Sequence, residues 1–156
     1  MVESADSSPS ELTYDDLAIG DTFEQGATTL TEDDIVSFAS EYDPQPFHLD
    51  HAAAENSMFG GLVASGLHTF SVCQRLATEA FFAHIAFMGG RGIDEMRWHR
   101  PVRPGDTLSA SVEIAAMRES DSKPDRGYVD VNIRGMNGDG DVVISWTALA
   151  IVGRVV

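Results

Sequence analysis

The sequence predicts an α+β fold in which one long central helix is wrapped by an antiparallel sheet of about five strands. The first observation is a nearly uncharged stretch, residues 65–87, whose apolar side chains recur at helical spacing. The second is a series of strand-like segments that follow it without another helix. The third is a set of turn signals between those segments, which suit antiparallel neighbours. This order predicts a helix and a sheet that share one core.

Length and composition favour one globular domain, which we expect to span residues 13–156. Residues 1–12 are expected to form a flexible acidic tail, because the N-terminal residues are polar and contain no apolar run typical of a signal peptide. The most apolar window, residues 67–87, contains Arg75 and Glu79, which a bilayer would disfavour. We therefore expect a cytoplasmic protein that does not insert into membranes.

The chain carries a formal net charge of −15, with 25 acidic residues and a single lysine, Lys123, among its ten lysines and arginines. Such a surface repels itself at low ionic strength, and salt screens the repulsion. The pattern indicates a halophilic, archaeal source, with an ordinary acidic cytosolic protein as the alternative. The charge also argues against nucleic acid as a general partner.

The residues before the central helix are expected to form shorter elements. A first strand is predicted at Asp21–Leu30, after a glycine-containing turn. Thr31 is a typical N-cap for a helix over residues 31–42. That helix must end before Pro44, because proline disfavours helical geometry in the residue that precedes it. A second, short helical segment is predicted at residues 52–56.

The central helix begins near Ser65, and its apolar stripe comprises Leu67, Phe70, Cys73, Ala77, Ala80 and Phe81. The lone cysteine of the chain lies in this stripe, so it is expected to be a small core side chain. A single cysteine cannot form a disulfide within the chain.

Strands are predicted after the helix, at residues 92–98, 107–117, 127–136 and 141–152. Asn137-Gly138 predicts a tight hairpin between the last two, and the polar residues 119–126 predict a mobile loop. A curved sheet around a central helix is the arrangement called the hotdog fold. Its edge strands would be exposed in a monomer, and pairing two subunits into one sheet would cover them. We expect a homodimer or a dimer of dimers.

The segment EYDPQPFHLDH, residues 41–51, combines two prolines with histidines and carboxylates. Asp43 and His48 are five residues apart, so a helix would separate their side chains by about 140° and a strand would point them to opposite faces. A bend stiffened by Pro44 and Pro46 can bring them together at low entropic cost. A carboxylate and an imidazole that share one water molecule can add it to an activated double bond, or remove it. A turn-stabilising Asp with a surface His is the alternative.

A second segment, FGGLVASGLHT at residues 59–69, leads into the central helix. Gly66 lies in the first turn, where no side chain obstructs its backbone N–H and the helix adds positive potential. Such a donor suits the enolate oxygen formed from a thioester, because preorganised donors stabilise developing charge. Glycine and serine also simply start helices, and that alternative stays open.

These two segments, together with HRPVRPGDTL at residues 99–108, resemble the MaoC-like dehydratase family, which includes the (R)-specific enoyl-CoA hydratases. The resemblance covers most of the chain beyond residue 12 and implies the hotdog fold. It implies that Asp43 and His48 form a water-activating dyad and that Gly66 is the oxyanion donor. The implied reaction is hydration of trans-2-enoyl-CoA, or dehydration of (R)-3-hydroxyacyl-CoA, in fatty acid metabolism. No separate cofactor is expected, because CoA is part of the substrate.

Two positions depart from the family pattern: Gln45 stands where Asn is usual, and Phe47 replaces a small aliphatic residue. These departures predict a differently shaped loop and acyl pocket. Phe47 and Ser65 are the candidate substrate-binding residues there. Two other functions remain open on the same fold, an acyl-CoA thioesterase and a non-catalytic acyl-CoA-binding module.

The phosphates of CoA require a basic patch on so acidic a protein. Residues 97–106, RWHRPVRPGD, supply one, and Arg100 and Arg103 are the candidate phosphate contacts because guanidinium groups match phosphate geometry. Ordinary ion pairs on a strand surface are the alternative. The histidines of the chain match no tight ligand spacing, so no metal site is expected.

Overall fold

The strands form one antiparallel sheet, along whose central strands buried side chains alternate with less buried ones, and the longest helix packs against it. The structure is a computed structural model that describes residues 11–155. Its elements are, in chain order, the 3-10 helix η1 (Tyr14–Asp16), β1 (Thr22–Glu24), β2 (Thr28–Thr29), α1 (Glu32–Tyr42), α2 (Pro46–Leu49), α3 (His51–Glu55), α4 (Gly66–Ala80), the 3-10 helix η2 (Phe82–His84), β3 (Phe87–Trp98), β4 (Thr107–Glu119), β5 (Arg126–Met136) and β6 (Val142–Gly153). The predicted α+β class is confirmed.

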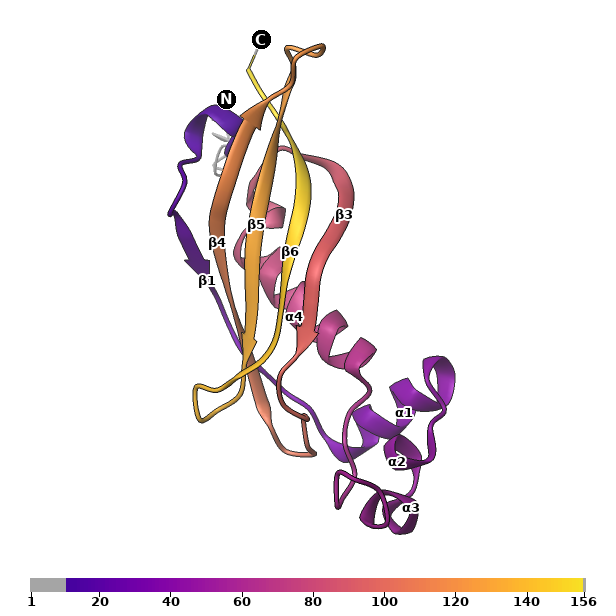
Figure 1. Cartoon of the computed structure of the whole chain (residues 1–156). Coiled ribbons are helices and arrows are strands. Elements are labelled where there is room, and N and C mark those ends of the chain that lie inside the picture. The colour runs from indigo at the N-terminus through magenta and orange to yellow at the C-terminus, as the bar shows by residue number, and fades with distance from the viewer. Residues whose placement is uncertain (1–10, 156) are drawn as a thin grey trace, which may run out of the picture.

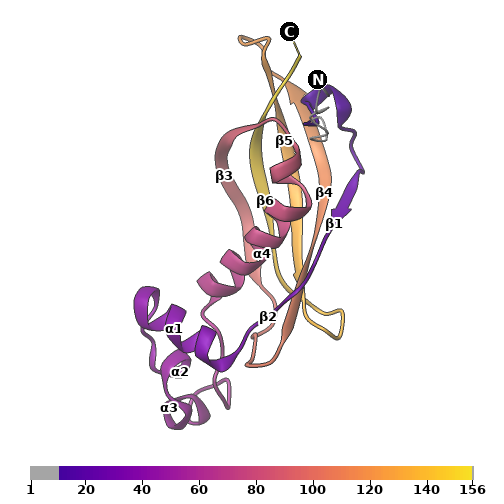
Figure 2. The same ribbon diagram turned by 180° about the vertical axis from the view of Figure 1, so that it is seen from behind.

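The sheet is ordered β1-β4-β5-β6-β3, and β2 also pairs with β4, so it has six strands where about five were expected. The strand pairs are antiparallel. Strands β4, β5 and β6 follow one another as hairpins, whereas β3 pairs with β6 at one margin (Figure 1). Helix α4 lies along one face of the sheet, behind it in Figure 1 and in front of it in Figure 2. This is the hotdog fold predicted from the sequence.

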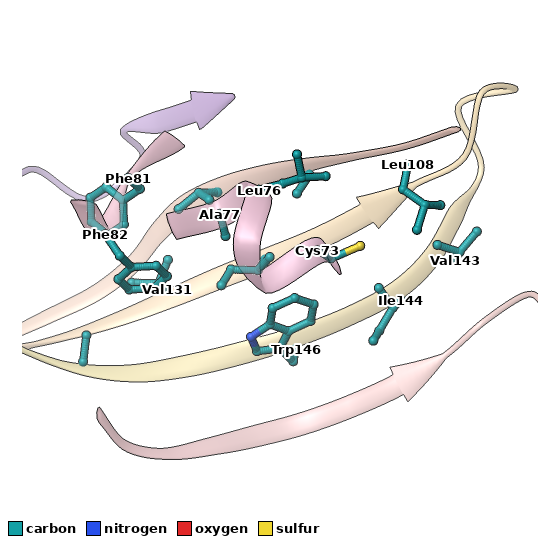
Figure 3. Packing of buried hydrophobic residues seen from close by; sticks show 14 of the residues in the cluster. Cys73, Leu76, Ala77, Phe81, Phe82, Leu108, Val131, Val143, Ile144 and Trp146 are labelled. Atoms are coloured by element: carbon teal, nitrogen blue, oxygen red, sulfur yellow. The ribbon is translucent and has the colours of Figure 1, made fainter. Parts of the chain in front are cut away.

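The core lies between α4 and the inner face of the sheet. Figure 3 shows three residues of α4, Cys73, Leu76 and Ala77, packed near side chains of the strands. The strand residues in this cluster include Leu108, Val131, Val143, Ile144 and Trp146. Each fully buried aliphatic side chain contributes roughly 1.5–3 kcal/mol relative to an exposed one. This apolar face therefore fixes the position of α4 on the sheet, and Cys73 is a core residue as predicted.

Helix α1 begins as the sequence predicts. The Thr31 hydroxyl accepts from the Asp34 N–H at 3.1 Å, and the Asp34 carboxylate accepts from the Thr31 N–H at 3.0 Å. This reciprocal arrangement satisfies two backbone donors that a helix start otherwise leaves free. Hydrogen bonding of the carboxylate to the backbone N–H and the side chain of Thr31 lowers the pKa of Asp34. Helices α1, α2 and α3 gather beyond one end of the sheet (Figures 1 and 2).

The central helix is shorter than the sequence predicts. Helix α4 ends at Ala80, and β3 begins at Phe87, five residues before the strand predicted at residue 92. An apolar run such as residues 81–87 suits a buried helix and a buried strand equally, so periodicity did not separate them. Glycines in the first half of β3, where its pairing with β6 shifts register, also weaken the strand signal of the sequence.

Two turns differ from the prediction. The strand expected over residues 21–30 is divided into β1 and β2 around Gly26, whose φ of 72° interrupts extended geometry. The hairpin between β5 and β6 is present, but residues 137–141 form its loop instead of a two-residue turn. Its left-handed residue is Gly140, with φ 81°, and the Asn137 side chain accepts from the N–H groups of Asp139 and Asp141.

Residues 1–10 of the expected N-terminal tail lie outside the described part of the chain. Leu12, which was also assigned to the tail, forms a parallel bridge with Ile85. Among residues 11–155, no helix combines the length and apolar character needed to cross a bilayer.

Candidate active site

Asp43 is held at the end of α1 by backbone hydrogen bonds. Its N–H donates to the Ala39 carbonyl at 2.9 Å, and the Gln45 N–H donates to the Asp43 carbonyl at 2.7 Å. Pro44 cannot continue the helix, so the chain turns at this residue. The bend predicted from the two prolines is therefore present.

His48 lies in α2, a one-turn helix that was not predicted. Pro46 takes its first position, where a missing N–H costs nothing. The His48 Nδ1 lies 2.7 Å from the carbonyl oxygen of Val63. Because a carbonyl oxygen can only accept, Nδ1 carries a proton, so Nε2 presents a lone pair when the imidazole is neutral.

Nε2 of His48 and Oδ2 of Asp43 lie 3.4 Å apart. This exceeds the usual range of about 2.7–3.2 Å for an N–H···O hydrogen bond. Both atoms are acceptors when the imidazole is neutral and the carboxylate is ionised, so neither satisfies the other. One water molecule that donates a hydrogen to each atom would satisfy both. The structure thus brings together the two side chains that the sequence singled out, in an arrangement suited to water.

Ser65 links Asp43 to the start of α4. Its hydroxyl donates to Asp43 Oδ2 at 2.7 Å and accepts from the Leu67 N–H at 3.2 Å. The residue is fully buried and is the N-cap of α4. The hydroxyl predicted to contact substrate is therefore already engaged by the carboxylate and the helix.

Gly66 is the first residue of α4. The N–H groups of the next three residues bond to Ser65, whereas within residues 11–155 no hydrogen-bond acceptor is found for the Gly66 N–H. The fifteen-residue helix places the positive end of its dipole here. Gly66 lines the same pocket as Asp43 and His48. Its N–H is therefore available to an oxygen atom of a ligand.

These polar groups share a pocket of about 530 Å³. Its apolar walls comprise Phe47, Met58, Phe59, Val63, Ala64, Leu67, Trp98, Pro101 and Val102. Phe47, predicted for the acyl pocket, packs with its ring centroid 4.6 Å from that of His48 and 5.3 Å from that of Phe59. Leu67, predicted in the buried stripe of the helix, is instead 48% exposed at this pocket. An apolar pocket with a few convergent polar groups is typical of a small-molecule site.

The two predicted phosphate contacts take different positions. Arg100 lines the pocket, and its Nε lies 3.9 Å from Oδ2 of Asp141. Arg103 points elsewhere, with its Nη2 donating to the carbonyl of Phe59 at 2.7 Å. That bond ties the loop before α4 to the β3–β4 loop. Arg103 therefore supports a wall of the pocket, and Arg100 remains beside the space that a ligand would occupy.

The other polar residues of segment 41–51 stabilise the local helices. His51 Nε2 lies 2.5 Å from Oε1 of Glu32, which joins α3 to α1. Asp50 is the N-cap of α3 and accepts from the Ala52 N–H. Throughout residues 11–155, no three His, Cys, Asp or Glu side chains are placed to hold a metal ion.

His68 lies away from this pocket, between α4 and α1. Its ring stacks on Phe38 with a centroid distance of 4.6 Å, and only 8% of the residue is exposed. Its Nδ1 has no hydrogen-bond partner among the described residues. Burial lowers the pKa of the His68 imidazole, and the Asp34 carboxylate acts weakly in the opposite direction. The ring is therefore neutral at neutral pH.

Sequence reasoning missed Trp98 and the link from Ser65 to Asp43. Trp98 stands in the segment RWHRPVRPGD, whose basic side chains and family resemblance gave no role to the tryptophan. Its Nε1 donates to the Gly66 carbonyl at 3.0 Å. An aromatic residue next to a cluster of predicted ligand-binding residues is a signal that could have found it.

The residues of this pocket fall largely within a known domain. The model of the MaoC like domain matches residues 16–134. The chain belongs to the MaoC-like family. The match includes Asp43, His48, Ser65 and Gly66, so the resemblance noted from the sequence is confirmed.

Two curated relatives of this MaoC-like protein match stretches of different length. The uncharacterized protein YdeM of Bacillus subtilis is 32% identical over 117 residues, which cover 75% of this chain and 79% of YdeM. Mesaconyl-CoA hydratase of Cereibacter sphaeroides is 39% identical over 63 residues, which cover 40% of this chain and 18% of that protein.

The crystal structure of the MaoC-like dehydratase from Rhodospirillum rubrum is similar to this chain, with a TM-score of 0.85 and 39% sequence identity. The superposition covers 93% of this chain and 99% of that one. Family membership and this likeness support a hydratase- or dehydratase-type enzyme in general terms.

Proposed function

We propose that the protein adds water to trans-2-enoyl-CoA thioesters, or removes it from (R)-3-hydroxyacyl-CoA thioesters. The observation that carries the proposal is the placement of Asp43 Oδ2 and His48 Nε2, two acceptors 3.4 Å apart, in one pocket with the Gly66 N–H. A shared water molecule would be activated by the pair. The thioester oxygen would accept from Gly66, where charge develops during the addition.

In the direction of hydration, the water oxygen bonds to C3 of the enoyl group while Asp43 accepts a proton from that water. The electron pair of the double bond moves to the thioester, and the enolate oxygen accepts from the Gly66 N–H. Nε2 of His48 takes that proton from the carboxyl of Asp43 and delivers it to C2. Both side chains end in the protonation states in which they began, and one water molecule has been added.

One assay in molar potassium chloride tests the proposal. Short trans-2-enoyl-CoA thioesters are mixed with the protein, and loss of the enoyl absorbance is followed beside a free-thiol assay. We expect the absorbance to fall without release of thiol. Thiol release would instead indicate a thioesterase, and tight binding without either signal would indicate an acyl-CoA-binding module. Either of these results would contradict the proposed reaction.

We propose that the reaction needs no cofactor apart from the CoA carried by the substrate, because hydration requires only proton transfers and an oxyanion donor. Arg100 is the proposed contact for a CoA phosphate, since it borders the pocket and its ion pair with Asp141 is long, at 3.9 Å. Arg100→Ala should raise KM several-fold and leave kcat nearly unchanged. An unchanged KM would remove Arg100 from CoA binding.

We propose that two copies of the chain pair through β3. This strand has twelve residues, occupies a margin of the sheet, and carries Phe87, Met88, Ile93 and Trp98, each 45–54% exposed. A long edge strand that exposes apolar side chains favours pairing with another strand. Sedimentation velocity at micromolar concentration should give a dimer or a dimer of dimers. A monomer would contradict the proposal.

A further inference from the structure

Trp98 lies directly against the glycine that opens α4. A Cβ atom at position 66 would stand 2.6 Å from Cε2 of the indole and 2.7 Å from its Nε1. Both atoms belong to a rigid ring, so a side chain at this position would force the whole indole to move. Any residue can adopt the backbone conformation of the first turn of a helix, so conformation alone does not require glycine here. Position 66 therefore requires glycine because of its contact with Trp98.

A hydrogen bond joins the same two residues. Trp98 Nε1 donates to the Gly66 carbonyl at 3.0 Å. The indole is itself fixed, because Trp98 ends β3 opposite Ile144 of β6, and the next N–H, that of His99, donates to Val143 at 2.8 Å. The end of β3 thus holds the first turn of α4 through packing and through a hydrogen bond.

We propose that Trp98 is a positioning residue for the Gly66 N–H, and this role rests on the proposed function. Glycine has more backbone freedom than any other residue. An oxyanion donor is effective when its direction is fixed before the reaction. The indole supplies that restraint by packing on Gly66 and bonding to its carbonyl. Trp98 therefore acts on the reaction through the glycine.

The partly exposed position of Trp98 agrees with this role. The residue is 54% exposed, although large apolar side chains are usually buried, and its ring also lines the pocket of Asp43 and His48. The second tryptophan, Trp146, is 2% exposed and packs against Phe70. Trp146 belongs to the core, whereas Trp98 borders the pocket and contacts Gly66.

A double-mutant cycle with trans-2-butenoyl-CoA tests the role. Gly66→Ala should lower kcat about 100-fold, because displacement of the indole misplaces the donor. Trp98→Phe, which keeps a ring but removes the N–H, should lower kcat about 5-fold with little change in KM. In a Trp98→Ala background, adding Gly66→Ala should cost less than about 3-fold, because the clash is gone. Gly138→Ala is the matched control, since a Cβ there meets open space.

A second readout needs no turnover. The indole N–H signals of the two tryptophans are recorded by 15N NMR, and the signal lost in Trp98→Phe identifies Trp98. Its hydrogen exchange should be slow in the wild type and at least about 10-fold faster in Gly66→Ala, because the bond to the Gly66 carbonyl breaks. A cooperative thermal unfolding transition, measured for each variant, would show that the variant remains folded.

An equal kcat loss from Gly66→Ala in both backgrounds would overturn the positioning role, and so would an indole signal that Gly66→Ala leaves unchanged. Suppose that the wild-type protein has no hydratase activity, but that its Trp98 indole N–H exchanges slowly and exchanges faster in Gly66→Ala. This result would refute the proposed function and leave the contact between Trp98 and Gly66 intact. The two failures are therefore distinguishable.

Discussion

The Asp43 carboxylate accepts a hydrogen bond from the Ser65 hydroxyl at 2.7 Å, across 22 residues of sequence. Asp43 closes α1 and Ser65 opens α4, so this bond joins the ends of two helices. The same hydroxyl accepts from the Leu67 N–H. One side chain therefore caps the buried helix and sets the orientation of the proposed base.

Ser65→Ala should lower both stability and turnover. Loss of the N-cap should reduce the free energy of unfolding by about 1 kcal/mol. Loss of the bond to the carboxylate should reduce kcat about 10-fold, because hydrogen bonds to charged groups are stronger than neutral ones. Chemical denaturation and initial rates measure the two effects. Ser71→Ala, an exposed serine of the same helix that bonds only to the Leu67 carbonyl, is the control. An unchanged kcat in Ser65→Ala would show that Ser65 caps the helix and does not orient Asp43 for catalysis.

Asp43→Asn and His48→Ala should each lower kcat by at least about 100-fold, since each removes a proton-transfer group. Asp43→Asn should leave the melting temperature nearly unchanged. His48→Ala should cost about 1–3 kcal/mol of stability, because the buried Val63 carbonyl loses its donor. His51→Ala is the matched control, since His51 bonds to Glu32 outside the pocket. Wild-type turnover in either variant would remove that residue from the mechanism.

Gly135→Ala should destabilise the core by about 1–3 kcal/mol through overpacking. A Cβ atom there would contact Cys73 Sγ and would lie 2.7 Å from Cγ2 of Ile144. Cys73→Ala in the same chain should recover part of the loss, because the sulfur is the nearest obstacle. Urea denaturation of the single and double variants gives the comparison. Equal loss with and without the sulfur would show that Ile144 alone causes the strain.

Stability should fall as the pH is lowered from 7 toward 5, in part because of His68. Burial lowers the pKa of His68 below its ordinary value of 6.5. The unfolded chain therefore gains a proton first on acidification, and stability is lost between pH 6.5 and the lower pKa of the folded state. His68→Gln should show a shallower pH dependence of the unfolding free energy. An identical slope in both proteins would contradict this contribution.

The melting temperature should rise across a potassium chloride series, because salt screens the repulsion within a chain of net charge −15. A rise that continues to molar salt would support a halophilic source. The same midpoint in dilute buffer and in molar salt would end that interpretation.

Much of the fold could be predicted because local signals and tertiary packing agree. Thr31 caps α1 with the geometry that its sequence suggests, and Cys73 and Ala77 are buried where helical spacing places them. The limits of β3 could not be predicted, because apolar residues around Phe87 suit helix and strand alike and glycines follow them. Tertiary pairing with β6 decides that segment.

The approach of Asp43 to His48 could be predicted, because two prolines restrict the short segment between them. The partners that come from distant segments could not. The bond from Ser65 to Asp43 spans 22 residues, and the bond from Trp98 to Gly66 spans 32. Such contacts depend on how whole elements pack, which no local pattern encodes. The bond from Arg103 to the Phe59 carbonyl is another contact between distant segments that the sequence did not predict.

The pocket draws the pair Asp43 and His48 and its walls from different parts of the chain. Residues 43–48 supply the pair, whereas Met58, Phe59, Pro101 and Val102 belong to connecting loops. Loops accept substitution more readily than the elements they connect. Natural variation can therefore change which ligands fit this pocket while Asp43 and His48 stay in place. A library confined to positions 58, 59 and 101 would be the economical way to alter which ligands the pocket admits.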